Sequence, residues 1–87
     1  MVNLEHFRVF YTVAKCGSLS KAAQQLFVSQ PAVSQSIKTL EVQLDTVLFI
    51  RNYRGIQLSP EGASIFKRVE DALALLDSAE NDLLNKK

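Results

Sequence analysis

Residues 18–44 have the sequence SLSKAAQQLFVSQPAVSQSIKTLEVQL, in which two helical patterns are separated by a short turn. In the first pattern, apolar side chains recur at i, i+3, i+4 and i+7, which is one face of a helix. These side chains are Leu19, Ala22, Ala23 and Leu26. Ser18 can cap the start of this helix by accepting a hydrogen bond from an unpaired backbone N–H group. The pattern predicts a short helix over residues 18–26.

A second apolar stripe follows the turn. Ser29 is again a capping residue, and Pro31 lies in the first turn, where its missing N–H group costs nothing. The stripe consists of Val33, Ile37, Leu40 and Leu44. The opposite face is polar, has no acidic residue before Glu41, and carries Gln30, Pro31, Ser34, Gln35 and Lys38. The pattern predicts a second helix that ends at Leu44.

This pair of helices is typical of a helix-turn-helix. The small side chains of Ala22 and Ala23 let the helices approach closely, as a short turn between them requires. Amide, hydroxyl and amine groups near the start of the second helix can contact base edges and phosphates in a DNA major groove. Every amphipathic helix has a polar outer face, so an ordinary helical hairpin is the alternative interpretation of this stretch alone.

The composition indicates one small globular domain. The chain has 87 residues, of which 47% are hydrophobic, and this suits a single modest core. It has no apolar run that could span a membrane and no signal-peptide pattern. The single cysteine and single histidine, Cys16 and His6, form no metal-binding set, so no metal or cofactor is expected. Cys16 is interpreted as a small apolar residue.

Charge is distributed unevenly along the chain. Residues 1–60 contain six basic and three acidic residues, whereas residues 61–87 contain four basic and six acidic ones. A basic first part and an acidic last part suit a nucleic-acid-binding module with a separate interaction helix.

A further helix is expected before residue 17. Asn3 can cap it, Glu5 suits the positive end of its dipole, and Gly17 can end it in a left-handed conformation. Its expected inward stripe consists of Leu4, Phe7, Tyr11 and Ala14, with Phe10 beside them. His6 and Arg8 are expected on the outer side. This helix would complete a three-helix core.

The segment after residue 46 predicts a β hairpin. Residues 47–51 are rich in β-branched and aromatic side chains, residues 56–58 form a second arm, and residues 52–55 can close the turn. A hairpin directly after such a helix makes a winged helix-turn-helix. Its tip carries Arg51 and Arg54, which can follow phosphates or enter a narrow minor groove. The alternative is two solvated surface arginines.

The last element is expected to be a long helix. Ser59 can cap it, Pro60 suits its first position, and Gly62 allows a close approach to another group. Its apolar seam has the spacing 4, 3, 4, 3 and 4, and consists of Ile65, Val69, Ala72, Leu76, Ala79 and Leu83. Leu73 and Leu84 widen this face. The period of 3.5 indicates pairing with the same helix of a second chain. Folding back onto its own domain is the alternative.

The combination of these residues resembles the N-terminal DNA-binding domain of LysR-type transcriptional regulators. The resemblance covers nearly the whole chain and rests on Ser20-Lys21-Ala22-Ala23, Leu26, Ser29-Gln30-Pro31-Ala32-Val33-Ser34, Ile37, Leu40-Glu41, Leu44, Leu48-Phe49, Arg51, Arg54-Gly55, Leu58-Ser59 and Gly62. It implies a mainly α fold, namely a winged helix-turn-helix with a three-helix core and a two-stranded β wing, followed by a long linker helix.

The resemblance also implies a division of labour. Residues 1–59 would be the DNA-binding domain and residues 60–87 the linker and dimerisation helix. The partners implied are partly palindromic promoter DNA and a second copy of the chain, with tetramers and a small inducer for the full-length regulator, whose C-terminal domain is absent here. The implied location is the bacterial cytoplasm, with the nucleoid.

Individual contacts follow from the resemblance. On the recognition helix, DNA contacts are expected from Gln30, Pro31, Ser34, Gln35 and Lys38. Phosphate contacts are expected from Ser18, Ser20 and Ser29, and wing contacts from Arg54, with Arg51 nearer the hairpin body. The chain departs from the family pattern at three places: the family usually has a glycine where Asp45 or Thr46 stands, often an alanine where Glu61 stands, and in many members an arginine where Gln35 stands. The last change favours adenine over guanine.

Two other classes of function compete with DNA binding. In a protein-interaction module, the recognition face would bind protein, and the acid-poor face and basic wing argue against this. An enzyme is not expected, because the sequence has no paired acids, no Ser/His/Asp set and no glycine-rich phosphate loop in a usable context.

Overall fold

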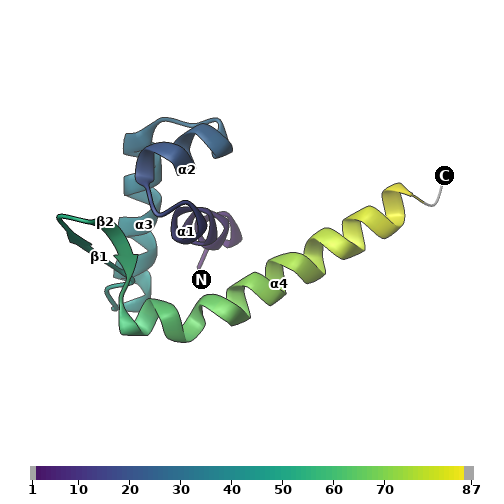
Figure 1. Cartoon of the computed structure of the whole chain (residues 1–87). Helices are drawn as coiled ribbons and strands as arrows, with labels where there is room; N and C mark the ends of the chain where they lie inside the picture. Colours follow the sequence, from purple (N-terminus) through teal and green to yellow (C-terminus); the bar gives the residue numbers. More distant parts are fainter. Residues whose placement is uncertain (1, 86–87) are drawn as a thin grey trace.

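The computed structural model describes residues 2–85, which form four helices and one two-stranded antiparallel sheet (Figure 1). The elements are α1 (Leu4–Cys16), α2 (Leu19–Leu26), α3 (Gln30–Leu44), β1 (Phe49–Asn52), β2 (Gly55–Leu58) and α4 (Pro60–Leu84). Three helices precede the hairpin and one long helix follows it, which confirms the predicted winged helix-turn-helix. The end of the predicted linker segment, residues 86–87, lies outside the described residues.

The helix starts lie where the sequence predicted them. Each N-cap side chain accepts a hydrogen bond from a backbone N–H group of the first turn; these residues are Asn3, Ser18, Ser29 and Ser59. Gly17 ends α1 with φ of 65°, and Asp45 ends α3 with φ of 51°. Asp45 thus takes the left-handed conformation expected at this turn. Phe27 takes it too, with φ of 57°, which is uncommon for a bulky residue.

The core is formed by the three short helices and the start of the hairpin. Its buried residues are Val9, Phe10, Val13, Leu19, Ala22, Ala23, Val33, Ile37, Leu40, Leu48 and Phe49. The apolar stripes predicted for α2 and α3 are therefore confirmed, with Leu26 and Leu44 half-buried at their ends. Cys16 is half-buried and packs against this core.

The inward stripe predicted for α1 is confirmed in part. Phe10 is buried and Phe7, Tyr11 and Ala14 are half-buried, whereas Leu4 is 49% exposed. The buried residues of α1 are Val9, Phe10 and Val13. The reason is that α1 packs against α2 and α3 on one side and against α4 on another. The predicted stripe includes the side chains that contact or approach α4. His6 and Arg8 are half-buried instead of fully outward-facing.

The hairpin is shorter at its first arm than predicted. β1 and β2 pair from Phe49 opposite Leu58 to Asn52 opposite Gly55, so β1 begins two residues later than expected. A long-range contact explains the difference. The Glu41 carboxylate of α3 accepts hydrogen bonds from the N–H groups of Leu48 (2.6 Å) and Phe49 (3.3 Å). The residues before β1 are therefore tied to α3.

The start of α4 lies directly against the loop before β1. The Ser59 hydroxyl donates to the Val47 carbonyl oxygen at 2.6 Å and accepts from the Gly62 N–H at 2.9 Å. A Cβ atom at Gly62 would collide with the backbone carbonyl of Leu48. The predicted close approach at Gly62 is thereby confirmed.

The first half of α4 packs on its own domain, and the second half projects away from it (Figure 1). The Phe66 ring stacks on Tyr11 of α1, with centroids 5.6 Å apart and planes at 16°. The Tyr11 hydroxyl donates to Glu70 at 3.4 Å, and Arg8 pairs with Asp77 at 3.6 Å. The alternative in which this helix folds back onto its own domain therefore holds as far as Asp77, and pairing with a second chain stays a prediction.

Candidate nucleic-acid interface

Helix α3 presents a polar face to solvent. Its apolar residues Val33, Ile37 and Leu40 are buried in the core, and this fixes the orientation of the helix. On the other side Gln30, Pro31, Gln35 and Lys38 are exposed and Ser34 is half-buried. A rigid helix with such a face has the shape and the groups that enter a DNA major groove.

Two hollows of mixed polar and apolar lining adjoin α3 and the wing. The first, of about 300 Å³, is lined by Gly17, Ser18, Leu19, Ser20, Gln30, Arg51, Asn52, Gly55 and Ile56. The second, also of about 300 Å³, is lined by Leu19, Ser34, Ile37, Lys38, Glu41, Phe49, Arg51 and Ile56. Arg51 belongs to both hollows. The structure thus brings the starts of α2 and α3 together with the wing.

The serine hydroxyls at the helix starts differ in whether their proton is available for a further hydrogen bond. Ser18 and Ser29 accept from the N–H groups of Lys21 and Ala32, both at 3.2 Å. Each hydroxyl keeps its proton, which can be donated to a phosphate oxygen. Ser20 instead donates its proton to Oε1 of Gln30 at 2.9 Å.

The tip of the wing is an arginine held by a tyrosine. Nε of Arg54 donates to the Tyr53 hydroxyl at 3.2 Å, and its guanidinium lies 5.5 Å from the centre of the Tyr53 ring. Tyr53 is 90% exposed. The sequence analysis missed Tyr53 as well as Glu41. The signal for Tyr53 was an aromatic residue beside an arginine in a tight turn.

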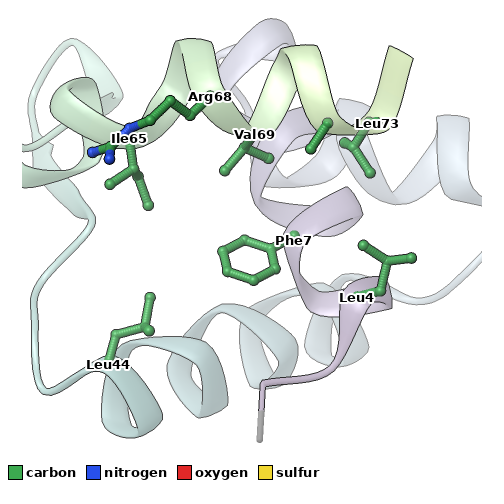
Figure 2. Close-up of a pocket in the computed structure, with 8 residues that line it drawn as sticks. Leu4, Phe7, Leu44, Ile65, Arg68, Val69 and Leu73 are labelled. Carbon is green, nitrogen blue, oxygen red and sulfur yellow. The ribbon is translucent and has the colours of Figure 1, made fainter. Parts of the chain in front are cut away.

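An apolar groove lies between α1, the end of α3 and the first half of α4 (Figure 2). Its volume is about 420 Å³, and it is lined by Leu4, Phe7, Leu44, Ile65, Arg68, Val69, Ala72 and Leu73. Figure 2 shows side chains from α1, α3 and α4 around this space. Leu73, which the sequence placed on the dimerisation face, is only 4% exposed because its own chain covers it. That residue has little surface left for a partner.

The remaining dimerisation residues fall into two groups. Ile65 and Val69 are half-buried against the core, whereas Ala72, Leu76, Ala79 and Leu83 are exposed. Leu76 is 46% and Leu83 71% exposed. The first part of the predicted seam therefore packs against its own core, whereas the second part stays exposed within residues 2–85.

Both basic residues of α4, Lys67 and Arg68, lie in its first half, which also contains Glu61, Glu70 and Asp71. The second half is acidic and contains Asp77, Glu80 and Asp82. Lys67 pairs within its helix with Asp71 at 3.1 Å and with Glu70 at 3.6 Å. The hydrogen bond to Asp71, followed by the charges of Asp71 and Glu70, raises the pKa of Lys67 above its ordinary value. Within residues 2–85, no helix has both the length and the hydropathy needed to cross a membrane.

Comparisons with known proteins agree with this geometry. Residues 4–63 match the family described as "Bacterial regulatory helix-turn-helix protein, lysR family". A probable RuBisCO transcriptional regulator of Cyanidioschyzon merolae is 43% identical over 74 residues, which are 85% of this chain and 24% of that protein. The chain spans about a quarter of the length of the curated relatives it matches. These relatives are transcriptional regulators and not enzymes.

Solved structures show the same arrangement. OxyR of Corynebacterium glutamicum has a TM-score of 0.93 and 28% identity, with 100% of this chain and 28% of that chain covered. A complex of BenM_DBD with benA site 1 DNA has a TM-score of 0.87 and 29% identity, with 98% of this chain and 99% of that chain covered. The whole described fold, including α4, therefore occurs in these proteins.

Proposed function

Because this chain belongs to the lysR family of bacterial regulatory helix-turn-helix proteins, we propose that it binds double-stranded promoter DNA in a sequence-specific manner. One observation carries this proposal. Gln30 of α3 lines one hollow, Ser34 of α3 lines the other, and the wing residue Arg51 lines both, so base-reading groups and a phosphate-binding cation share one surface. The DNA complexes among the similar structures support the proposal.

In this proposal each element has a separate role. Helix α3 enters the major groove, where Gln30, Pro31, Ser34 and Gln35 face the bases. Lys38 and the helix starts at Ser18 and Ser29 hold phosphates, since helix N-termini and cations both attract anions. Arg54 enters the minor groove, and Arg51 follows the backbone between wing and α3.

Salt-dependent binding tests this proposal. The 87-residue chain is titrated with a duplex enriched from a random pool and with a scrambled duplex, at several salt concentrations. The enriched duplex should bind more tightly, and its log affinity should fall linearly with log salt, because displaced counterions are released from the phosphates. Equal binding of both duplexes would contradict sequence specificity, and absence of binding to either would favour the protein-interaction alternative.

We also propose that residues 1–59 bind DNA and residues 60–87 dimerise, by antiparallel pairing of α4 with a second copy. The seam spacing of 4, 3, 4, 3 and 4 is the same in both directions. An antiparallel partner therefore brings its Leu83 to Ile65, its Ala79 to Val69 and its Leu76 to Ala72. Its exposed half would cover the apolar groove at the first half of α4.

The charges favour the same direction of pairing. In the antiparallel register, Arg68 of each α4 lies opposite Glu80 of the other. A parallel pair would place Glu80 beside Glu80 and Asp77 beside Asp77. Opposite charges across a helix pair specify its orientation. For the full-length protein, tetramers, a small inducer and a cytoplasmic location remain proposals on the resemblance alone.

A further inference from the structure

We propose that Ser20 and Thr39 are positioning residues. Each orients the side-chain amide of one glutamine on α3 and so determines whether its oxygen or its NH₂ group faces the DNA bases. The inference rests on the proposed function and concerns its specificity. Gln30 and Gln35 lie on the exposed face of α3. A glutamine amide has an oxygen that accepts and an NH₂ group that donates. A neighbour that occupies one end therefore leaves the other end for a base.

Gln30 is held by its oxygen. The Ser20 hydroxyl, at the start of α2, donates to Oε1 of Gln30 at 2.9 Å. This bond turns the oxygen toward α2 and leaves both protons of the NH₂ group free. In the major groove, guanine presents two neighbouring acceptors, N7 and O6, and thymine presents O4. Gln30 should therefore act as a donor and favour guanine or thymine.

Gln35 is held by its nitrogen. Nε2 of Gln35 donates to the hydroxyl oxygen of Thr39 at 3.2 Å, one turn further along α3. The amide oxygen keeps both lone pairs, and one N–H proton remains. Adenine presents a donor at N6 beside an acceptor at N7, which matches this arrangement, whereas guanine offers two acceptors. Gln35 should therefore favour adenine.

The two bonds change the role expected of Ser20. A serine hydroxyl has one proton, and in the structure that proton goes to Gln30. Phosphate contact at the start of α2 then falls to Ser18, whose proton is free while its oxygen caps the helix. Ser20 and Thr39 thus act on the bases through another side chain, and their loss should alter base preference without altering charge.

Selection from a random duplex pool tests the inference. The Gln30→Ala and Gln35→Ala chains first identify the base-pair position that each amide contacts. Ser20→Ala should then lower discrimination at the Gln30 position by about two- to tenfold, the value of one hydrogen bond, and leave the Gln35 position unchanged. Thr39→Val should do the reverse. Ser20→Thr keeps the hydroxyl and should keep the wild-type preference.

Two matched variants control for hydroxyl loss itself. Ser64→Ala and Thr12→Val each remove a hydroxyl that bonds only to a backbone carbonyl, on α4 and α1 respectively, and neither should change the selected sequence. Affinity for a scrambled duplex and the salt slope should be the same in all five serine and threonine variants as in the wild type, because none of these substitutions changes the charge.

A DNA-free measurement examines the bonds directly. In the free protein, Ser20→Ala should shift the side-chain amide NMR signals of Gln30 and not those of Gln35, and Thr39→Val should shift those of Gln35 alone. Unshifted signals would overturn the inference. A defined wild-type site that neither variant alters would overturn the positioning role alone. If the wild-type chain enriches no sequence from the random pool, both the proposed sequence-specific DNA binding and the positioning role are overturned.

Discussion

Single side chains at the proposed DNA surface differ in what they can contribute to binding. Lys38 and Arg54 are exposed cations, whereas Gln35 is an exposed neutral amide. A cation that touches a phosphate releases a counterion and strengthens binding to any sequence. An amide neutralises no phosphate, so its contribution depends on the base that it faces.

This difference predicts separate effects of three substitutions. Gln35→Ala should weaken binding to the enriched duplex by roughly 1–3 kcal/mol and leave the scrambled duplex nearly unaffected. Lys38→Ala and Arg54→Ala should weaken both duplexes and lower the salt slope by about one unit each. Fluorescence anisotropy at several salt concentrations measures both quantities. Equal weakening of both duplexes by Gln35→Ala, with no effect of Arg54→Ala, would show that helix and wing had been assigned wrongly.

Gly62 offers a residue-scale test of the fold, because two physical effects oppose each other there. In an exposed helix, Gly→Ala stabilises by roughly 0.5–1 kcal/mol. At Gly62 the added Cβ meets the Leu48 carbonyl, so Gly62→Ala should instead destabilise by about 1–3 kcal/mol. Thermal unfolding measures the change.

Ala74, on an exposed part of α4, provides the opposite comparison. Ala74→Gly should cost about 1 kcal/mol through helix propensity alone. A stabilised Gly62→Ala chain would show that α4 does not start against the loop before β1.

At the scale of elements, the helical hairpin depends on how closely α2 approaches the rest of the core. Ala23 is 6% exposed and belongs to the core. Ala23→Leu should overpack this site and cost roughly 1–3 kcal/mol in the free energy of unfolding. Gln24→Leu places the same side chain at an exposed position of the same helix and should change the melting temperature little. Equal melting temperatures of the two variants would contradict the close packing.

Local signals predicted the elements well, and long-range contacts account for the errors. Ser18, Ser29 and Ser59 cap helices through bonds to residues three positions away, so neighbouring sequence contains the whole interaction. The face of α1 depends on α4, which lies about 60 residues later in the sequence. The start of β1 depends on Glu41 of α3. Periodicity within one segment contains no information about such partners.

The sequence predicted which residues belong to the candidate site better than it predicted the contacts between them. The sequence identified Gln30, Gln35 and the two wing arginines, because polar residues on an apolar-backed helix and basic residues in a turn are local features. It contained no signal that Ser20 bonds to Gln30 or that Arg51 lies between two hollows. Those facts depend on the packing of three separate elements.

At the scale of the whole molecule, the proposed dimer depends on charges that face each other between two copies. Arg68→Glu should weaken self-association, because it places two acidic groups opposite each other. Glu80→Arg should do the same with two basic groups. The double variant restores opposite charges and should recover most of the wild-type dimer in sedimentation equilibrium at low salt. Leu76→Asp should abolish the dimer by placing a charge in the seam.

Two results would contradict the antiparallel arrangement. One is a double variant that associates no better than either single variant. The other is a chain that stays monomeric at millimolar concentration, with Leu76→Asp changing nothing.

The contacts between α1 and α4 give the protein a lever. The Tyr11–Phe66 stack and the Arg8–Asp77 pair determine the angle at which α4 projects from the helix-turn-helix domain. Because the part of α4 from Phe66 to Leu84 is about 27 Å long, tilting it by roughly 10° moves its far end by about 5 Å. That displacement is larger than one base-pair step of about 3.4 Å. In the proposed dimer, substitutions in these α1–α4 contacts would therefore change the distance between the two DNA-binding domains. The preferred spacing of the two DNA half-sites would change with it, although none of the substituted residues contacts DNA.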